Sequence, residues 1–365
     1  MNIDFSNLQY QYQLYKNEID EAIQNVLNKS NYIMGEEIDI LEKNLEDFTG
    51  VNNAITCGSG TDALLLALMA LDIQPGDEII TTPFTFISTA ETISFLKAKP
   101  VFVDIDPNTY NINPLKIEEA ITNKTKIILP VSLFGQPSDL NKIQEIANKN
   151  NLKIIIDGAQ SFGSTYHSVS DSNIGDISIT SFFPAKPLGC FGDGGAVFTN
   201  NDKLAKKIKS LRIHGQSEKY YYKYIGMGAR MDTIQASILN VKLRHYKKDL
   251  DLRNQVADKY SKGLSQKIKI PFVQNGLYSA WAQYSIQIDN RDKIKEILAN
   301  KGIPTAIHYP LPLHLQECFL FLGYKSGDFP ISEELSNKIL SLPINPYLKN
   351  NEIEYIINSL NEVMI

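Results

Sequence analysis

Cysteine is scarce in this chain, with three residues among 365. Cys57, Cys190 and Cys318 are odd in number and lack the spacing of metal ligands. The sequence therefore predicts neither a disulfide framework nor a metal site, and we expect three reduced thiols.

Long apolar runs are also missing. No stretch of about 18 uninterrupted apolar residues occurs, and the first twenty residues are too polar for a secretory signal. We therefore expect no membrane association and a cytoplasmic location.

An excess of positive charge is the third absence. The chain carries 36 Lys and Arg against 41 Asp and Glu, a formal net charge of -5, and has no extended basic run. This balance predicts no nucleic-acid partner. An anionic ligand would have to be held by backbone dipoles and individual side chains.

The composition that remains is typical of a globular protein, with 43% hydrophobic and 21% charged residues. Apolar β-branched runs such as "TKIIL" and "KIIID" alternate with helical patterns along the first two thirds of the chain. Such continuous runs indicate parallel strands covered by helices on both faces. We predict an α/β fold, with a large domain over residues 1–240 and a smaller α+β domain over 241–365. Ligands of such sheets lie beyond the carboxyl ends of the strands.

One predicted strand, "NAITC", ends in Gly58-Ser59-Gly60-Thr61, and a helix follows at once. Free N–H groups at a helix start can hold a phosphate, and glycine lets the anion approach the backbone. A tight turn with Thr61 as the N-cap explains the same residues equally well.

A second strand, "KIIID", ends in Asp157. A carboxylate that leaves a buried strand needs a partner, because an isolated buried charge is costly. Asp157 could cap a helix or join a buried ion pair. It could also be the counter-ion of a ring nitrogen that must stay protonated.

The third strand end leads to "SFFPAKPLGCFGDGGA", in which Lys186 lies between Pro184 and Pro187. The prolines restrict the backbone on both sides, so this lysine is held in a fixed direction. Most lysines are solvated surface charges. An oriented, partly desolvated amine is instead what Schiff-base chemistry requires.

A phosphate cradle, a carboxylate and a directed lysine at strand ends together match pyridoxal 5'-phosphate (PLP). Its phosphate needs N–H donors, its pyridinium nitrogen a carboxylate and its aldehyde an amine. The three features together are far more specific than any one of them.

These residues lie within segments that resemble the DegT/StrS family of fold type I PLP enzymes, which aminate nucleotide-linked keto-sugars. The similarity runs nearly end to end and includes "GSGTDALLLAL", "PGDEIITTPFTFISTAETI", "IDGAQSFGS", "RMDTIQASIL" and "AIHYPLPLH". It implies a large domain with a mostly parallel sheet sandwiched by helices, a smaller α+β C-terminal domain, and a homodimer with shared active sites.

The resemblance implies roles for the cofactor-site residues. Lys186 would bind the PLP aldehyde, and Asp157 would pair with the pyridinium nitrogen. Gln160 would contact the 3-hydroxyl or the ring face, and Phe86 would stack on the ring. Without the resemblance, Gln160 could be a helix-start residue and Phe86 a core aromatic.

Further positions follow from the same motifs. Gly60, Thr61 and Ser181 would hold the phosphate. On the substrate side, His308 and Tyr309 match the family motif, and Arg230 looks like the arginine near the sugar. A structural histidine and an exposed helix-start arginine are the competing interpretations.

One position departs from the family. A "G-x-N-x-R" motif usually places an asparagine that reaches the PLP phosphate of the neighbouring subunit, whereas this chain has Gly228 there. The departure puts that contact between subunits in doubt.

The family implies a ping-pong transamination with L-glutamate as the amino donor and a nucleotide sugar as the acceptor. The motifs resemble most the branch acting on 3-oxo sugars, such as UDP-2-acetamido-2-deoxy-3-oxo-glucuronate aminotransferases of surface-polysaccharide (O-antigen, lipopolysaccharide) synthesis. The branch acting on 4-keto-6-deoxy sugars is a close alternative. A PLP-dependent sugar dehydratase is less consistent, because those enzymes carry histidine where Lys186 stands, and a non-catalytic regulator would need no intact trio.

Overall fold

A seven-stranded sheet forms the centre of the larger part of the molecule, in the order β1-β9-β8-β5-β4-β2-β3. The computed structural model describes residues 3–364. The strands of this sheet are β1 (Asn53–Cys57), β2 (Glu78–Thr81), β3 (Lys99–Phe102), β4 (Thr125–Ile128), β5 (Lys153–Asp157), β8 (Ile177–Ser181) and β9 (Gly195–Thr199).

Five neighbouring strands of the sheet, from β3 to β8, pair in parallel. The exception is β9, which pairs antiparallel with both β1 and β8. A loop joins β8 directly to β9 without a crossover helix, and adjacent strands joined in this way can only run antiparallel. The prediction of a mostly parallel α/β sheet is thus confirmed.

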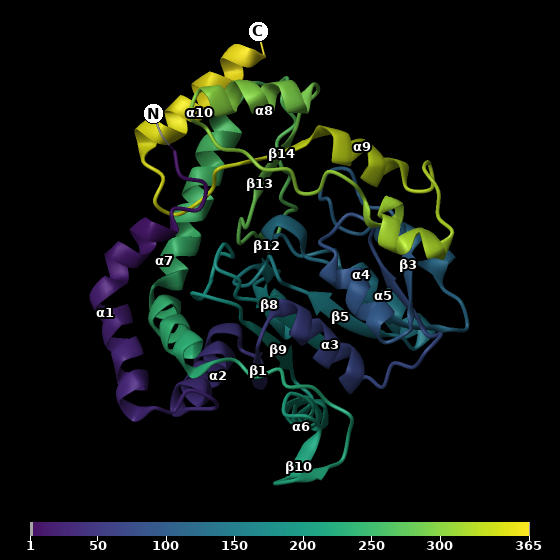
Figure 1. Cartoon of the computed structure of the whole chain (residues 1–365). Helices are drawn as coiled ribbons and strands as arrows, with labels where there is room; N and C mark the ends of the chain where they lie inside the picture. Colours follow the sequence, from purple (N-terminus) through teal and green to yellow (C-terminus); the bar gives the residue numbers. More distant parts are fainter. Residues whose placement is uncertain (1–2, 365) are drawn as a thin grey trace.

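Helices cover both faces of this sheet (Figure 1). They are α2 (Glu36–Thr49), α3 (Gly60–Ala70), α4 (Ser88–Phe95), α5 (Leu140–Asn150) and α6 (Asp202–Leu211). On β5, Ile155 packs into the core beneath α3 and α6, whereas Ile154 and Ile156 pack into the core beneath α5. Burial on both faces explains why this strand reads as a continuous apolar run.

Two long helices lie along one side of the molecule, α1 (Leu8–Lys29) beside α7 (Thr233–Gly263) (Figure 1). Helix α7 runs through the predicted boundary at residue 240. Its side chains as far as Leu250 belong to the cores of the larger part, and those from Val256 onward belong to the core of the smaller part. The division at residue 240 stays a prediction.

The smaller part is built around the antiparallel pair β13 (Tyr284–Gln287) and β14 (Ile339–Leu342). Helices α8 (Arg291–Asn300) and α10 (Asn350–Val363) contribute to its core, and α9 (Pro330–Lys338) lies beside the larger part. A small sheet joins the two parts, because β12 (Leu277–Tyr278) pairs with β6 (Thr165–Tyr166), which also pairs with β7 (Val169–Ser170).

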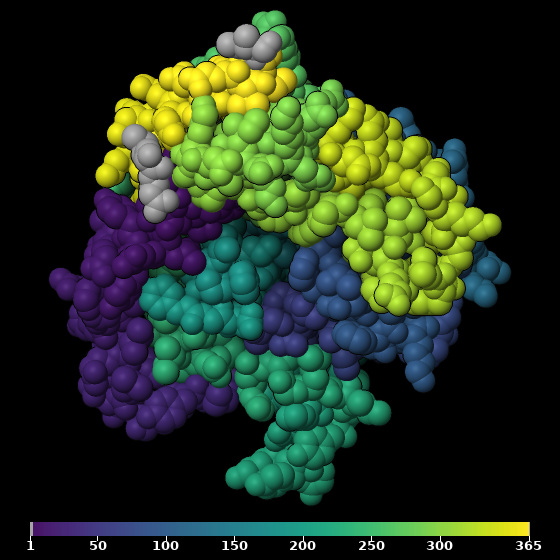
Figure 2. All heavy atoms as spheres, turned by 45° about the horizontal axis from the view of Figure 1, so that its top comes forward, coloured from purple at the N-terminus to yellow at the C-terminus, as the bar shows by residue number. Residues whose placement is uncertain are grey.

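A hairpin of β10 (Gln216–Glu218) and β11 (Tyr221–Tyr222) projects beyond α6, away from the body of the molecule. Figure 2 shows it as a protrusion. Its tip and base expose Tyr220, Tyr221, Tyr222 and Ile225. Within residues 3–364, no helix is long and apolar enough to cross a membrane.

Candidate active site

A cavity of about 510 Å³ opens at the carboxyl ends of the parallel strands. Nine of the ten predicted site residues line it: Gly60, Thr61, Phe86, Asp157, Gln160, Ser181, Lys186, His308 and Tyr309. Residues from both parts of the chain therefore meet at one site, which fits the rule for open α/β sheets.

Lys186 reaches the cavity from the loop between β8 and β9. Its own N–H donates to the carbonyl of Phe183, closing a tight turn over residues 183–186 that includes Pro184. Burial lowers the pKa of Lys186 to about 8, and the negative charge of Asp157 opposes part of that shift. About a tenth of the amine is thus unprotonated at pH 7, far more than for an ordinary lysine, and the unprotonated amine is the form that acts as a nucleophile or base.

Asp157 lies at the end of β5 and is 4% exposed. Its Oδ2 accepts a hydrogen bond of 2.8 Å from Thr89, and its Oδ1 accepts one of 3.2 Å from the N–H of Ala159. Burial raises the pKa of Asp157, while these bonds and Lys186 lower it. The carboxylate forms no salt bridge within the described residues, so a cationic ligand would find an unpaired anion here.

The predicted phosphate cradle lies where α3 begins. Ser59 caps this helix by accepting the N–H of Asp62 at 3.0 Å. The N–H groups of Gly60 and Thr61 lie in the first turn and have no intrahelical partners, so they remain available to a ligand. A Cβ on Gly60 would lie 2.8 Å from the Cβ of Ser181. Only glycine permits this approach of the helix start to the end of β8.

Gln160 is hydrogen-bonded to two aromatic residues, one of which lines the cavity. Its Oε1 accepts the N–H of Phe134 at 2.9 Å, and its Nε2 donates to the hydroxyl of Tyr309 at 3.1 Å. The Phe86 ring lies 6.3 Å from that of Tyr309 and is 54% exposed. Phe86 is therefore no core aromatic and is free to contact a ligand.

His308 contributes a neutral imidazole. Its Nδ1 lies 2.9 Å from Oγ of Ser341, which in turn lies 2.8 Å from Oγ of Ser285. Burial and, to a smaller extent, the charge of the nearby Lys186 lower the pKa of His308 to about 4. With Nδ1 engaged by a serine, Nε2 is the ring nitrogen that remains for a ligand.

Arg230 is the one predicted site residue that does not line the cavity. It follows Ala229, whose carbonyl accepts the N–H of Gly58 behind the phosphate cradle. At the neighbouring Gly228, a Cβ would lie 3.0 Å from the imidazole of His214. The histidine ring thus occupies the space into which a side chain at position 228 would project.

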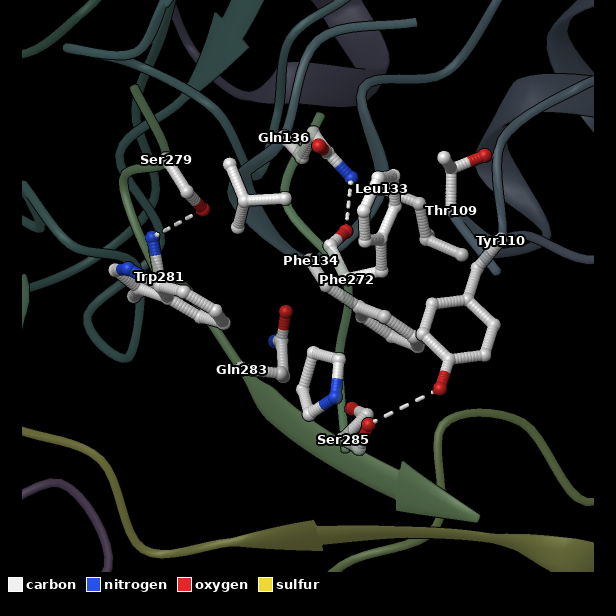
Figure 3. A pocket seen from close by; sticks show the side chains of 12 residues that line it. Thr109, Tyr110, Leu133, Phe134, Gln136, Phe272, Ser279, Trp281, Gln283 and Ser285 are labelled. Atoms are coloured by element: carbon white, nitrogen blue, oxygen red, sulfur yellow. Dashed lines mark hydrogen bonds between the residues drawn. The ribbon is translucent and has the colours of Figure 1, made fainter. Parts of the chain in front are cut away.

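Sequence reasoning missed several polar residues of the site, among them Thr89 and Gln283. Thr89 is recognisable only after folding, because its hydroxyl meets Asp157 across 68 residues. Gln283 precedes β13 and also lines a second cavity of about 20 Å³ (Figure 3). Its buried Oε1 has no hydrogen-bond partner in the described part of the chain. No sequence motif singles it out.

The residues present fit PLP. An unpaired buried carboxylate, an amine with a lowered pKa and a helix start that tolerates only glycine surround one cavity. The described residues contain no group of three His, Cys, Asp or Glu side chains suited to a metal, and their three cysteines are free.

Comparisons with known proteins agree with this site. The model of the DegT/DnrJ/EryC1/StrS aminotransferase family matches residues 13–361. The UDP-2-acetamido-2-deoxy-3-oxo-D-glucuronate aminotransferase of Pseudomonas aeruginosa is 44% identical over 359 residues, covering 98% of this chain and 99% of that protein.

Solved structures match over the whole fold. A DegT DnrJ EryC1 StrS aminotransferase from Brucella abortus superposes with a TM-score of 0.96 at 40% identity, covering 99% of both chains. The NtdA protein of Bacillus subtilis, with the cofactor PMP bound, gives 0.93 at 30% identity, covering 100% of this chain and 85% of its own. With the family match over nearly the whole sequence, these likenesses confirm that the chain belongs to the DegT/DnrJ/EryC1/StrS aminotransferase family.

Proposed function

We propose that this PLP-dependent aminotransferase transfers an amino group from L-glutamate to C3 of a 3-oxo sugar linked to a nucleoside diphosphate. The observation that carries the proposal is that Lys186 and Asp157 line one cavity and interact electrostatically. The Pseudomonas relative acts on a 3-oxo uronate, which supports this carbonyl position. We place the reaction in the cytoplasm, in surface-polysaccharide synthesis.

When bound, PLP supplies an aldehyde for the incoming amine and a protonated ring that withdraws electrons. Lys186 would hold the aldehyde through its amine, and the same amine, when free, would accept or return a proton at the substrate carbon. Asp157, fixed by Thr89, would keep the ring nitrogen protonated. Gly60, Thr61 and Ser181 would bind the phosphate, and Phe86 would contact the ring.

The charge of the cavity supports a dimer with shared sites. Both substrates are anions, yet Lys186 is the only Lys or Arg among the residues that line the cavity, and Asp157 and Asp193 are acidic. Further cations must therefore come from outside the lining residues. We assign this role to Arg230 of a second copy, which would meet the sugar or its carboxylate.

The exposed hairpin supports the same assembly. A two-stranded hairpin is marginal in water by itself. Here it presents three tyrosines and Ile225, which is 92% exposed. A second copy of the chain would cover these side chains, and a homodimer is the commonest symmetric assembly.

The experiment that tests the function follows the bound cofactor. The purified protein is expected to be yellow, to lose that colour with L-glutamate, and to regain it with a UDP-linked 3-oxo sugar. A panel of UDP- and dTDP-linked 3-oxo and 4-oxo sugars assigns the position. Recovery with 4-oxo sugars alone would contradict the 3-oxo assignment, and absence of any glutamate response would contradict glutamate as the donor.

A further inference from the structure

A buried lysine behind the Lys186 loop has no part in the mechanism above. Lys242 lies on α7 and is 4% exposed. Its ammonium forms no salt bridge with the described residues. Instead it donates a hydrogen bond to the carbonyl of Gly189 and lies 5.5 Å from the ring centroid of Phe191. A buried, unpaired ammonium is costly, so its position calls for an explanation.

Both of its contacts belong to the loop that carries Lys186. This loop, residues 182–194, is closed at its base, where Phe182 bonds with Gly194 and Cys190 at 2.7 and 2.8 Å. A Cβ on Gly189 would lie 2.5 Å from the carbonyl oxygen of Pro184. The part of the loop before Lys186 and the part after it are therefore in direct contact. A displacement of Gly189 would also move the turn that carries Lys186.

A second α7 side chain binds the part of the loop that follows Lys186. Gln235 accepts the N–H of Phe191 at 2.8 Å through its Oε1. Residues 235 and 242 are seven apart, two helical turns, so they project from the same face of α7. Tyr12 of α1 adds an edge contact to the Phe191 ring at 5.9 Å. One face of α7 thus binds the loop at two nearby residues, Gly189 and Phe191.

We propose that Lys242, assisted by Gln235, is a positioning residue that tethers the loop at Gly189 and Phe191 and so fixes the direction of Lys186. The inference rests on the proposed role of Lys186. A charged donor suits this task, because hydrogen bonds from an ammonium to a carbonyl are stronger than neutral ones. Burial lowers the pKa of Lys242 to about 8, with Cys190 and Asp249 opposing the shift and Arg253 adding to it.

The test replaces Lys242 by methionine, which keeps the length of the side chain but removes the donor. Lys247→Met, at an exposed lysine of the same helix, is the matched control. In the PLP-loaded Lys242→Met enzyme we expect faster hydrogen exchange in peptides spanning 182–194 and a shifted pH midpoint for the absorbance of the bound cofactor. We expect kcat to fall about 10- to 100-fold, with KM for glutamate changed less than about threefold, because misplacement affects the reacting geometry more than binding.

If Lys242 only stabilised the fold, Lys242→Met would lower the unfolding temperature, while hydrogen exchange, the pH midpoint and kcat would stay as in Lys247→Met. That result would overturn the proposal. If Lys242→Met does not fold, Gln235→Leu removes the other tether and is expected to change the same properties in the same direction, less strongly. Unchanged properties in Gln235→Leu then contradict the tether. A wild-type enzyme that does not hold PLP on Lys186 contradicts the proposed function instead, while hydrogen exchange still reports on the tether.

Discussion

The hydroxyl of Thr89 donates a hydrogen bond of 2.8 Å to Oδ2 of Asp157, from the first turn of α4 to the end of β5. This bond is one of two that stabilise the ionised carboxylate against its burial. The proposed protonated ring nitrogen therefore depends on Thr89, which acts through its hydrogen bond to Asp157.

Thr89→Val is expected to raise the pKa of Asp157 and to lower kcat by about 10-fold, because a hydrogen bond to a buried charge is lost. The acid limb of the pH profile of kcat should move to higher pH. Thr92→Val is the matched control, since the Thr92 hydroxyl bonds to Ser88 on the same helix and does not touch Asp157. Identical pH profiles for the two variants would count against this role of Thr89.

Asp157→Asn should lower the catalytic rate but raise the stability of the cofactor-free protein. We expect kcat to fall about 100-fold or more, the loss common when one preorganised electrostatic group is removed. In the cofactor-free protein the folded-state pKa of Asp157 is raised, so ionisation costs folding free energy that begins near the unfolded pKa of about 4 and is complete above the folded-state pKa. The Asn variant should therefore be more stable than wild type at pH 7, and the difference should shrink as the pH falls toward about 4. Urea unfolding of the apoproteins at several pH values measures this, and a less stable Asn variant at pH 7 would contradict it.

Gln283 is expected to contact the sugar nucleotide, because its buried Oε1 lacks a partner beside the cavity. Gln283→Ala should raise KM for the sugar about 5- to 20-fold, the effect of one hydrogen bond to a ligand. The half-reaction with glutamate, followed by loss of colour, should keep its rate. An equal loss in both half-reactions would show that Gln283 acts on the cofactor or the fold instead.

Arg230 provides a test of the shared active site. Lys186→Ala and Arg230→Ala should each be inactive alone. When the two are co-expressed, random pairing makes half of the dimers mixed, and each mixed dimer has one site with both residues intact, so about a quarter of wild-type activity should return. If Arg230 serves the cavity of its own subunit, the mixture stays inactive.

The sequence could predict those parts of the site that follow strands. Asp157 and Lys186 stand next to apolar β-branched runs, and Gly60 opens a helix directly after one, so local patterns sufficed. Thr89 lies within one of the segments that resemble the family, but neither it nor Gln283 directly follows a predicted strand. Their roles arise from contacts over long sequence separations. The antiparallel direction of β9 was likewise not readable from its own residues, since it depends on the loop that replaces a crossover helix.

Helix α7 shows the same limit for domain organisation. Its polar, helical pattern predicts a long helix, but only packing reveals that it contributes to the core of both parts and holds the Lys186 loop through Gln235 and Lys242. Lys242 looks like any helical lysine in the sequence. Its burial becomes visible once α7 is placed against the loop.

The central claim is that the amine of Lys186 is the group that holds PLP. Reduction of the yellow enzyme with borohydride, followed by proteolysis and mass spectrometry, tests this directly. The account predicts a phosphopyridoxyl group on the peptide that contains Lys186 and on no other peptide, and its loss in Lys186→Ala. A label on another lysine, or cofactor that is never attached to the protein, would contradict it.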